Sequence, residues 1–387
     1  MKIEYSKKIQ NLPPYLFLEI DQAKRKARQE GRDLIDLGIG DPDLPTPDNI
    51  IKKLSEAAKD PKNHKYALDQ GMPGLRQGIA DWYKKRFSVS LNPESEILPL
   101  IGSKEGIAHM PLAFIDPGDY VLAPNPSYPP YRGSTILSGG LVYDLPLLAK
   151  NNFLPDLGNI PREIIQKAKL MFLNYPNNPT GATADKEFYL KAIGFASKNN
   201  IIIAHDAAYS EMSYDGYRPM SFLELKGAKE TGVEFHSLSK TYNMTGWRIG
   251  WVCGNSEIIS GIAKVKSNID SGIFSAIQIA GIEALTGPQE HIPEMRAIYQ
   301  ERRDILCEGL KNLGWITSRP KATFYVWVNV PPGYDSRRFA ALLLDKCDIV
   351  VTPGVGFGQD GEGYIRLTLT VAKERIIEAL ERIKKRL

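Results

Sequence analysis

The stretch EFHSLSKTYNMTGWRIGW, residues 234 to 251, brings a lysine, two serines and an arginine close together between apolar flanks. These polar residues are Ser237, Ser239, Lys240 and Arg248. A lysine amine can attach covalently to an aldehyde, and an arginine can hold a phosphate through two parallel hydrogen bonds. A lone lysine is usually a solvated surface residue, so this chemistry needs support from other segments.

Polar residues also follow three other short apolar runs. Ser103 and Lys104 open a predicted helix after LPLI, where free N–H groups and the helix dipole suit a phosphate. The segment NNPTG at 177–181 follows MFLNYP, and Asp206 follows IIIAH, with Tyr209 three residues later. Ligands of open α/β sheets bind at the carboxyl ends of the strands, so we expect all of these residues on one rim.

Each of these features has an ordinary structural alternative. A single acid such as Asp206 is more often the cap of a helix, and a single tyrosine such as Tyr209 is more often core. NNPTG alone reads as a turn, and GSKEG lacks the spacing of a nucleotide P-loop. Their joint occurrence, each at a strand end, favours a binding site.

The combination suits pyridoxal phosphate, which needs a Schiff-base lysine, a carboxylate at its pyridine nitrogen and a cradle for its phosphate. Asp206 would keep the ring nitrogen protonated, because an opposite charge raises the pKa of that nitrogen. Tyr209 would donate to the phenolic oxygen of the ring, and Arg248 would bind the phosphate.

The elements that must position these residues alternate between short apolar strands and helical patterns from about residue 97 to 285. This alternation predicts a mainly parallel sheet with helices on both faces. The predicted strands are EILPLIG, DYVLAP, AKLMFLNYP, NNIIIAHD, GVEFHSLS and IGWVCG, and a helix is expected near 185–199.

The pattern changes after residue 285. Helices are expected at about 291–313 and 335–346, with the strands FYVWVNV, DIVVTP and GYIRLTL and a final helix. The first 45 residues lack a sheet pattern and are expected to pack on this smaller α+β unit. We therefore predict a large cofactor-binding domain at 46–285 and a small domain built from 1–45 and 286–387.

Composition limits the class of protein. The chain has 387 residues, is 43% hydrophobic and 24% charged, and carries a net charge of +4, which gives no case for nucleic acid or a membrane surface as partner. Cys253, Cys307 and Cys347 fit reduced thiols and show no metal-ligand spacing. The N-terminus lacks the apolar core of a signal peptide and no run has transmembrane length, so a cytoplasmic protein is expected.

Taken together, these motifs resemble the class I/II, fold type I pyridoxal-phosphate aminotransferases over essentially the whole chain. The family pattern S-x-S-K-x5-G-x-R matches from Ser237 to Arg248, and NNPTG and D-x-x-Y match at 177–181 and 206–209. The resemblance implies a seven-stranded sheet and assigns Lys240 as the Schiff-base lysine. It also implies that Ser103, Lys104, Ser237, Ser239 and Arg248 surround the phosphate.

The same resemblance assigns further residues. Tyr128, in NPSYPPY, stands where the family stacks an aromatic ring on the cofactor, and Asn178 would contact both cofactor and substrate. Arg366, in GYIRLTL, would bind the substrate α-carboxylate. HKYALDQGMPGLR resembles the family segment through which Tyr66 reaches the phosphate of the other subunit, so a homodimer with shared active sites is implied.

Within the family, LPPYLFLEID, LGIGDPDLPTP, IGSKEGIAHMPLAFIDPGD and TPGVGFGQDGEGYIRLTLT are similar to the branch that acts on LL-diaminopimelate in lysine biosynthesis. By position, Tyr15 and Gly40 would touch substrate, and Lys104 would lie between phosphate and substrate. Asp69 stands where many of those enzymes carry a glutamate that the partner subunit contributes near the distal end of the substrate.

Three alternatives follow from the sequence. Aspartate, alanine or aromatic aminotransferases share the mechanism, and pyridoxal-phosphate lyases that act on a β- or γ-leaving group, such as C–S lyases, share the fold. A non-catalytic regulator in which this fold follows a DNA-binding domain is disfavoured, because a helix-turn-helix unit does not fit before residue 45 and no basic patch is present.

Overall fold

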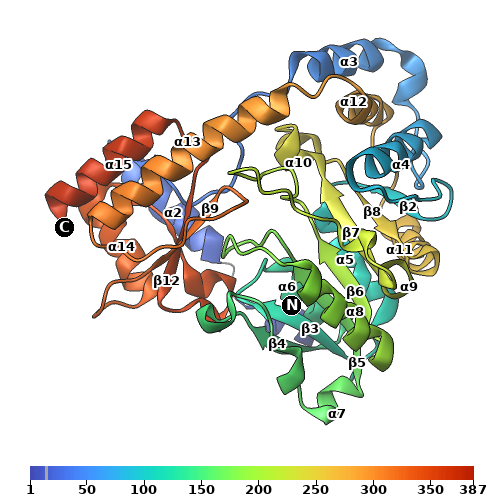
Figure 1. The fold of residues 1–387 in the computed structure, drawn as a ribbon, viewed down its shortest axis with the longest axis horizontal. Helices are drawn as coiled ribbons and strands as arrows, with labels where there is room; N and C mark the ends of the chain where they lie inside the picture. The colour runs from blue at the N-terminus through green and yellow to red at the C-terminus, as the bar shows by residue number, and fades with distance from the viewer. Residues whose placement is uncertain (14–15) are drawn as a thin grey trace.

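The computed structural model describes residues 1–13 and 16–387, and its central element is a seven-stranded sheet (Figure 1). The strand order is β2-β8-β7-β6-β5-β3-β4. β8 (Gly250–Gly254) is antiparallel to both neighbours, and the other strands are parallel to one another. These are β2 (Ile97–Leu100), β3 (Tyr120–Asn125), β4 (Leu141–Pro146), β5 (Ala168–Asn174), β6 (Ile202–Asp206) and β7 (Gly232–Ser237). The predicted mainly parallel sheet is therefore confirmed.

The strands are apolar along their length because helices cover both faces of the sheet. In β5, Leu170 and Phe172 face one hydrophobic cluster, whereas Met171 and Leu173 face the other. One face is covered by α5 (Ser103–Phe114), α6 (Pro130–Ser138) and α11 (Ser256–Ile269). The opposite face is covered by α4 (Pro73–Phe87), α8 (Lys186–Asn199) and α12 (Ser275–Thr286).

A second α+β unit lies beside the large sheet, joined to it by the long helix α13 (His291–Asn312) (Figure 1). It contains the antiparallel sheet β11-β12-β9 and the helices α2, α14 and α15. Their bounds are β9 (Tyr325–Asn329), β11 (Thr352–Pro353), β12 (Tyr364–Thr368), α2 (Leu16–Gln29), α14 (Ser336–Cys347) and α15 (Lys373–Arg386).

The N-terminal segment takes part in this second unit. Ile35 and Leu37 share a hydrophobic cluster with Phe324 and Ile383 from the C-terminal part of the chain. Residues 35–36 also form β1 (Ile35–Asp36), which pairs in parallel with β10 (Ile349–Val350). The first 45 residues lack a sheet pattern in the sequence because the strand that they contribute is only two residues long. The domain boundaries near residues 46 and 286 stay a prediction.

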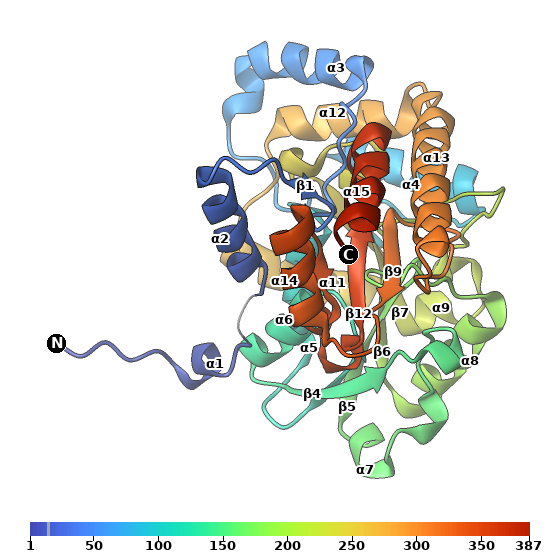
Figure 2. The same ribbon diagram turned by 90° about the vertical axis from the view of Figure 1, so that its left-hand side faces the viewer.

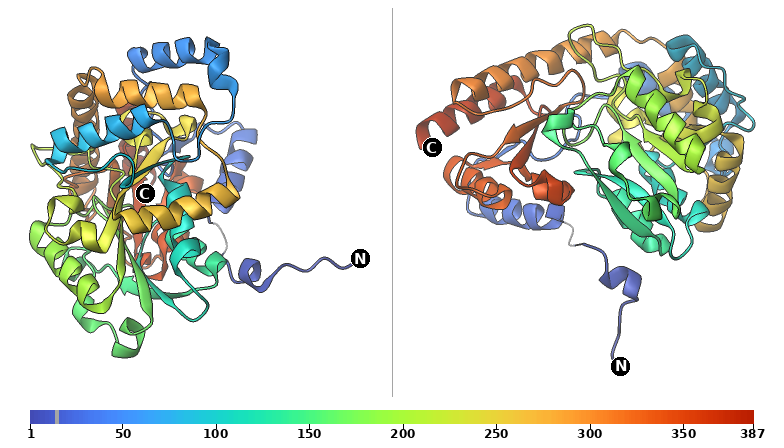
Figure 3. Two further views of the ribbon diagram at one scale, coloured as in Figure 1. Left: turned by 90° about the vertical axis from the view of Figure 1, so that its right-hand side faces the viewer. Right: turned by 60° about the horizontal axis from the view of Figure 1, so that its bottom comes forward.

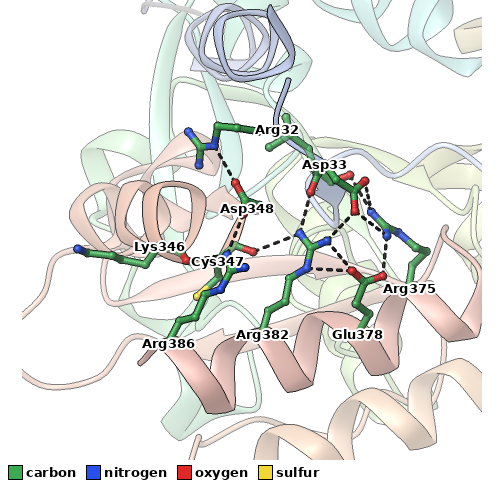
Figure 4. Close-up of polar contacts among 10 residues, drawn as sticks. Arg32, Asp33, Lys346, Cys347, Asp348, Arg375, Glu378, Arg382 and Arg386 are labelled. Carbon is green, nitrogen blue, oxygen red and sulfur yellow. Dashed lines mark hydrogen bonds and ion pairs between the residues drawn. The ribbon is translucent and has the colours of Figure 1, made fainter. Parts of the chain in front are cut away.

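Charged residues tie the N-terminal segment to α15 and to Asp348, which lies between α14 and β10 (Figure 4). Asp33 accepts hydrogen bonds from Arg375 at 2.7 Å and Arg382 at 2.6 Å, and these bonds lower the pKa of its carboxyl. Asp348 forms ion pairs with Arg32 at 2.7 Å and Arg386 at 2.9 Å. The chain end and the N-terminal segment are thus held side by side.

The N-terminal end extends away from the body of the molecule, and the short helix α1 (Lys7–Gln10) that follows it contacts α6 (Figures 2 and 3). The remaining α-helices are α3 (Asp48–Lys59), α7 (Arg162–Ile165), α9 (Ala228–Thr231) and α10 (Leu238–Thr241). Within the described residues, none of the helices combines the length and the apolar character needed to cross a membrane.

Candidate active site

A cavity of about 240 Å³ lies at the carboxyl ends of the sheet strands, where the two units meet. Most of the residues predicted from the sequence line it. These are Gly40, Ser103, Lys104, Tyr128, Asn178, Asp206, Tyr209, Ser237, Ser239, Lys240, Arg248 and Arg366. The strand-end rule predicted the lining residues between Ser103 and Arg248, whereas Gly40, Tyr128 and Arg366 were predicted from the family resemblance.

Lys240, the predicted attachment point of the cofactor, lines the cavity. It lies on the short helix α10, directly after β7, and its Nζ donates to the carbonyl of Gly40 at 3.3 Å. Burial, with the nearby Arg366 and Arg248 adding to it and Asp41 opposing it, lowers the pKa of the Lys240 amine to about 8. About a tenth of the amine is thus neutral at pH 7, and covalent chemistry with an aldehyde requires this neutral form.

Asp206 ends β6 and is buried, with an exposed fraction of 6%. Its Oδ2 accepts a hydrogen bond from Tyr131 Oη at 2.8 Å, and its Oδ1 accepts only a long one, 3.4 Å, from the N–H of Ala208. Burial raises the pKa of the Asp206 carboxyl, and the bond from Tyr131 opposes that shift. A buried acid with spare acceptor capacity suits a cationic partner such as a protonated ring nitrogen.

The helix-cap alternative for Asp206 is wrong. A turn, not a helix, follows β6 over residues 208–211, and the chain then continues irregularly to Ser221. The carboxylate is held by Tyr131 instead. NNPTG does form the expected turn, since Asn177 Oδ1 accepts from the N–H of Thr180 at 3.0 Å, while Asn178 lines the cavity. The turn and site interpretations are thus compatible for that segment.

The N-terminus of α5 forms one end of the cavity. Its N-cap is Gly102, which provides no side-chain cap, so the first N–H groups of the helix stay available for an anion. A Cβ at Gly102 would lie 2.5 Å from Nη2 of Arg248, and the φ of +76° also favours glycine. The guanidinium is therefore held against the helix end. Ser237 and Ser239 complete a set of donors that fits a phosphate dianion.

Arg366, on β12, is fully buried at the other end of the cavity. Its Nη1 donates to Asn178 Oδ1 at 2.8 Å and its Nη2 to the carbonyl of Gly38 at 2.8 Å. Within the described part of the chain, its Nε lacks a hydrogen-bond partner. The guanidinium also lies 4.1 Å from the ring centroid of Tyr325. A buried cation held by neutral groups can bind a carboxylate from a ligand.

Several lining residues were not predicted: Pro129, Asn174, Ala208, Tyr325 and Phe357. Asn174 ends β5 as Asp206 ends β6, so the strand-end rule could have found it. Its Nδ2 donates to the carbonyl of Asp206 at 2.8 Å. Tyr325 comes from β9 of the second unit and lies 3.1 Å, oxygen to oxygen, from Tyr209, and no local signal in the sequence indicated it.

Two predicted residues do not line the cavity of their own chain. Tyr66 is 97% exposed, and Asp69 is partly exposed on the same segment. Both were expected to act in the site of a partner subunit, which stays a prediction. Tyr15 lies outside the described residues.

The site and fold define the class of protein. The aminotransferase class I and II family matches residues 32–383, and the chain belongs to this family. The protein is therefore a transaminase, and its family is in general pyridoxal-phosphate dependent. The buried Asp206, the uncapped end of α5 and the low pKa of Lys240 fit that cofactor.

Individual members of this family are similar to this chain over nearly their full length. The LL-diaminopimelate aminotransferase of Syntrophobacter fumaroxidans is 57% identical over 98% of this chain and 98% of its own. The enzyme of the same name from Moorella thermoacetica is 54% identical over 99% of this chain and 98% of its own. Among solved structures, substrate-bound BacF from Bacillus subtilis is 40% identical with a TM-score of 0.95, covering 100% of this chain and 98% of that chain.

Proposed function

We propose that this transaminase binds pyridoxal phosphate in the 240 Å³ cavity and exchanges amino groups between LL-diaminopimelate and a 2-oxo acid. The reaction in the biosynthetic direction converts tetrahydrodipicolinate and glutamate to LL-diaminopimelate and 2-oxoglutarate, on the route to lysine. The observation that carries the chemistry is the pairing of a low-pKa lysine, Lys240, with a buried guanidinium, Arg366, across one cavity. Identities of 54% and 57% to LL-diaminopimelate aminotransferases support the substrate.

When bound, pyridoxal phosphate supplies an aldehyde for the amine and a ring that withdraws electrons from the substrate Cα. The protein supplies the rest. Arg366 holds the α-carboxylate of the substrate through two parallel hydrogen bonds. Lys240 Nζ is partly unprotonated near neutral pH. It removes the proton from the substrate Cα and holds that proton as an ammonium. Asp206 stabilises positive charge at the deep end of the cavity, and Tyr128 covers the face of the ring.

A homodimer with shared active sites is part of this proposal. Four large apolar side chains are exposed on two adjoining segments: Tyr66 at 97%, Leu68 at 69%, Ile269 at 60% and Phe274 at 42%. These segments touch, since a Cβ at Gly272 would lie 2.4 Å from the carbonyl oxygen of Leu68. Exposed apolar groups of this size mark a protein interface. Pairing of two copies here would carry Tyr66 and Asp69 into the partner site.

We also propose a cytoplasmic location. Cys253, Cys307 and Cys347 are free and buried, as in proteins of reducing compartments. Biosynthetic relatives point the same way.

The chemistry is tested with a panel of amino acids and the purified enzyme. Conversion of the cofactor to its amine form by a donor alone, with release of the matching 2-oxo acid, is expected of a transaminase. Elimination of a side-chain group with release of ammonia would instead make the protein a lyase. Lys240→Ala is expected to abolish turnover and the absorbance of lysine-bound cofactor, and normal activity of this variant would exclude the proposed role.

The substrate is tested at Asp69. A charge-assisted hydrogen bond to the distal ammonium of LL-diaminopimelate is worth about 1.5–3 kcal/mol. Asp69→Asn should lower kcat/KM for LL-diaminopimelate by about ten- to a hundredfold, and change that for glutamate little because glutamate lacks the ammonium. An equal loss on both substrates would make Asp69 a loop-structuring residue. Absence of LL-diaminopimelate activity in the wild type would favour an aspartate, alanine or aromatic aminotransferase.

A further inference from the structure

A buried lysine lies behind the cavity, outside the residues that the proposed reaction uses. Lys266, on α11, has an exposed fraction of 0%. Its Nζ donates to Glu105 Oε1 at 2.9 Å, to Asp270 Oδ1 at 2.7 Å and to the carbonyl of Ser271 at 3.0 Å. All three protons of the ammonium are therefore used, which fixes its position between the first turn of α5 and the segment directly after α11.

The first of these partners belongs to the phosphate end of the cavity. Glu105 is the third residue of α5, and its Oε2 accepts a hydrogen bond from the backbone N–H of Ile101. The carboxylate thus bridges the residue before Gly102 and the ammonium of Lys266. Between Ile101 and Glu105 lie Ser103 and Lys104, the two residues of α5 that line the cavity.

The other partners belong to the segment after α11. Asp270 and Ser271 follow the helix directly, and the next residue, Gly272, packs against the chain at Ala67 and Leu68. A Cβ at Gly272 would lie 2.4 Å from the Leu68 oxygen and 2.7 Å from the Ala67 oxygen. Lys266 therefore connects the first turn of α5 to the segment that carries Tyr66.

His109 also faces this cluster and raises the question of a metal. Ligand atoms of Glu105, His109 and Asp270 lie within 4.8 Å of one another. The Nδ1 of His109 is 3.7 Å from Glu105 and its Nε2 is 3.6 Å from Asp270. Because the Lys266 ammonium already lies between the two carboxylates, it provides the positive charge that a metal ion would otherwise supply. We therefore assign the cluster to Lys266 rather than to a metal.

We propose that Lys266 is a positioning residue for the cofactor phosphate, holding the first turn of α5 so that its N–H groups converge on the anion. This inference rests on the proposed function, since it concerns the phosphate of pyridoxal phosphate. The helix end has no side-chain cap of its own, so its geometry depends on the Glu105 bridge. Loss of the ammonium would leave two partly buried carboxylates repelling each other next to that turn.

The test compares two probes that differ only in the phosphate. Pyridoxal phosphate and pyridoxal are titrated into full-length enzyme stripped of cofactor, and binding is followed by absorbance. Lys266→Met, similar in length but neutral, should weaken pyridoxal phosphate binding by at least about tenfold, the equivalent of one charge-assisted hydrogen bond. Pyridoxal binding should change by less than about twofold. The matched control is Lys264→Met, an exposed lysine on the same helix, which should alter neither affinity.

Three results would overturn the proposal: equal losses for both probes, unchanged pyridoxal phosphate binding, or the same effect from Lys264→Met. If Lys266→Met does not fold, Asp270→Asn, which removes the negative charge of one partner at a partly exposed position, replaces it with the same criteria. A wild type that binds neither probe would refute the proposed function itself. A wild type that prefers the phosphate, with a variant that keeps the same preference, would refute only the role of Lys266.

Discussion

Tyr131 Oη donates a hydrogen bond of 2.8 Å to Oδ2 of Asp206, inside the protein and beneath the cavity. Tyr131 is fully buried on α6, and its ring stacks on Phe172 at 4.7 Å with an interplanar angle of 13°. The tyrosine is thereby fixed in orientation, and it fixes one oxygen of the carboxylate. The other oxygen, Oδ1, stays available to a ligand.

Tyr131→Phe removes this donor and leaves the ring stacking in place. Because the bond from Tyr131 lowers the pKa of Asp206, that pKa should rise in the variant. The acid limb of the kcat/KM profile should move to higher pH. At neutral pH kcat should fall by about ten- to a hundredfold, as expected for a hydrogen bond to a charged group. Stopped-flow and steady-state rates measured across roughly pH 5 to 9 give both effects.

Tyr214→Phe is the matched control for that variant. Tyr214 is also buried, and its hydroxyl donates to the carbonyl of Thr323 at 2.7 Å rather than to Asp206. This variant should lose stability without a shift in the pH profile. A shift of the same size in both variants would contradict a specific role for Tyr131.

Asp206→Asn should separate catalysis from stability. Burial raises the pKa of this acid in the folded protein, so its charged form costs stability once pH rises above the usual value of about 3.9. Without cofactor, the variant should therefore unfold at a higher temperature than the wild type at pH 7, and the difference should vanish below about pH 4.

The same variant should lose at least about a hundredfold in kcat, because an amide cannot stabilise a protonated ring nitrogen. Calorimetry and steady-state kinetics on one preparation measure both quantities. A variant that is less stable but fully active would show that Asp206 serves the fold alone.

Gly40→Ala should introduce a steric clash in the wall of the cavity. The new Cβ would lie 2.1 Å from Oη of Tyr325, and the Gly40 carbonyl accepts from Lys240. Overpacking of this kind costs about 1–3 kcal/mol, and the same cost on binding in the cavity would lower kcat/KM by about five- to 150-fold. Gly133→Ala is the control, since a Cβ there meets nothing within 4 Å. It should raise stability by up to about 1 kcal/mol and leave activity unchanged.

The lowered pKa of Lys240 predicts how the rate of cofactor capture depends on pH. Only the neutral amine attacks the aldehyde, and the pKa of Lys240 is lowered to about 8. Capture of pyridoxal phosphate by cofactor-free enzyme should therefore accelerate as pH rises to about 8 and level off above it. Absorbance changes after mixing give the rate, and reduction followed by peptide mapping identifies the lysine. A midpoint near 10.4, the ordinary value for lysine, would show that the amine is not perturbed.

Local patterns in the sequence were enough to predict much of this site. Lys240 and Arg248 are separated by a short stretch of chain that follows one strand, so their proximity is encoded in that stretch. The helix expected near 185–199 forms as α8, because Asp185 caps it by accepting from the N–H of Phe188. The polar residues that follow the strands were predicted to lie together, since the carboxyl ends of parallel strands share one edge of a sheet.

Other features depended on tertiary structure. The edge strand β4 was not predicted, and the antiparallel direction of β8 is set by its pairing with β2 and β7. Asp206 reads as a helix cap in isolation but is held by Tyr131, 75 residues earlier in the chain. Tyr325 and Phe357 reach the cavity from the second unit. Such contacts form only when distant segments pack together, because residue spacing encodes the geometry of a turn, helix or strand but not the partner against which it is buried.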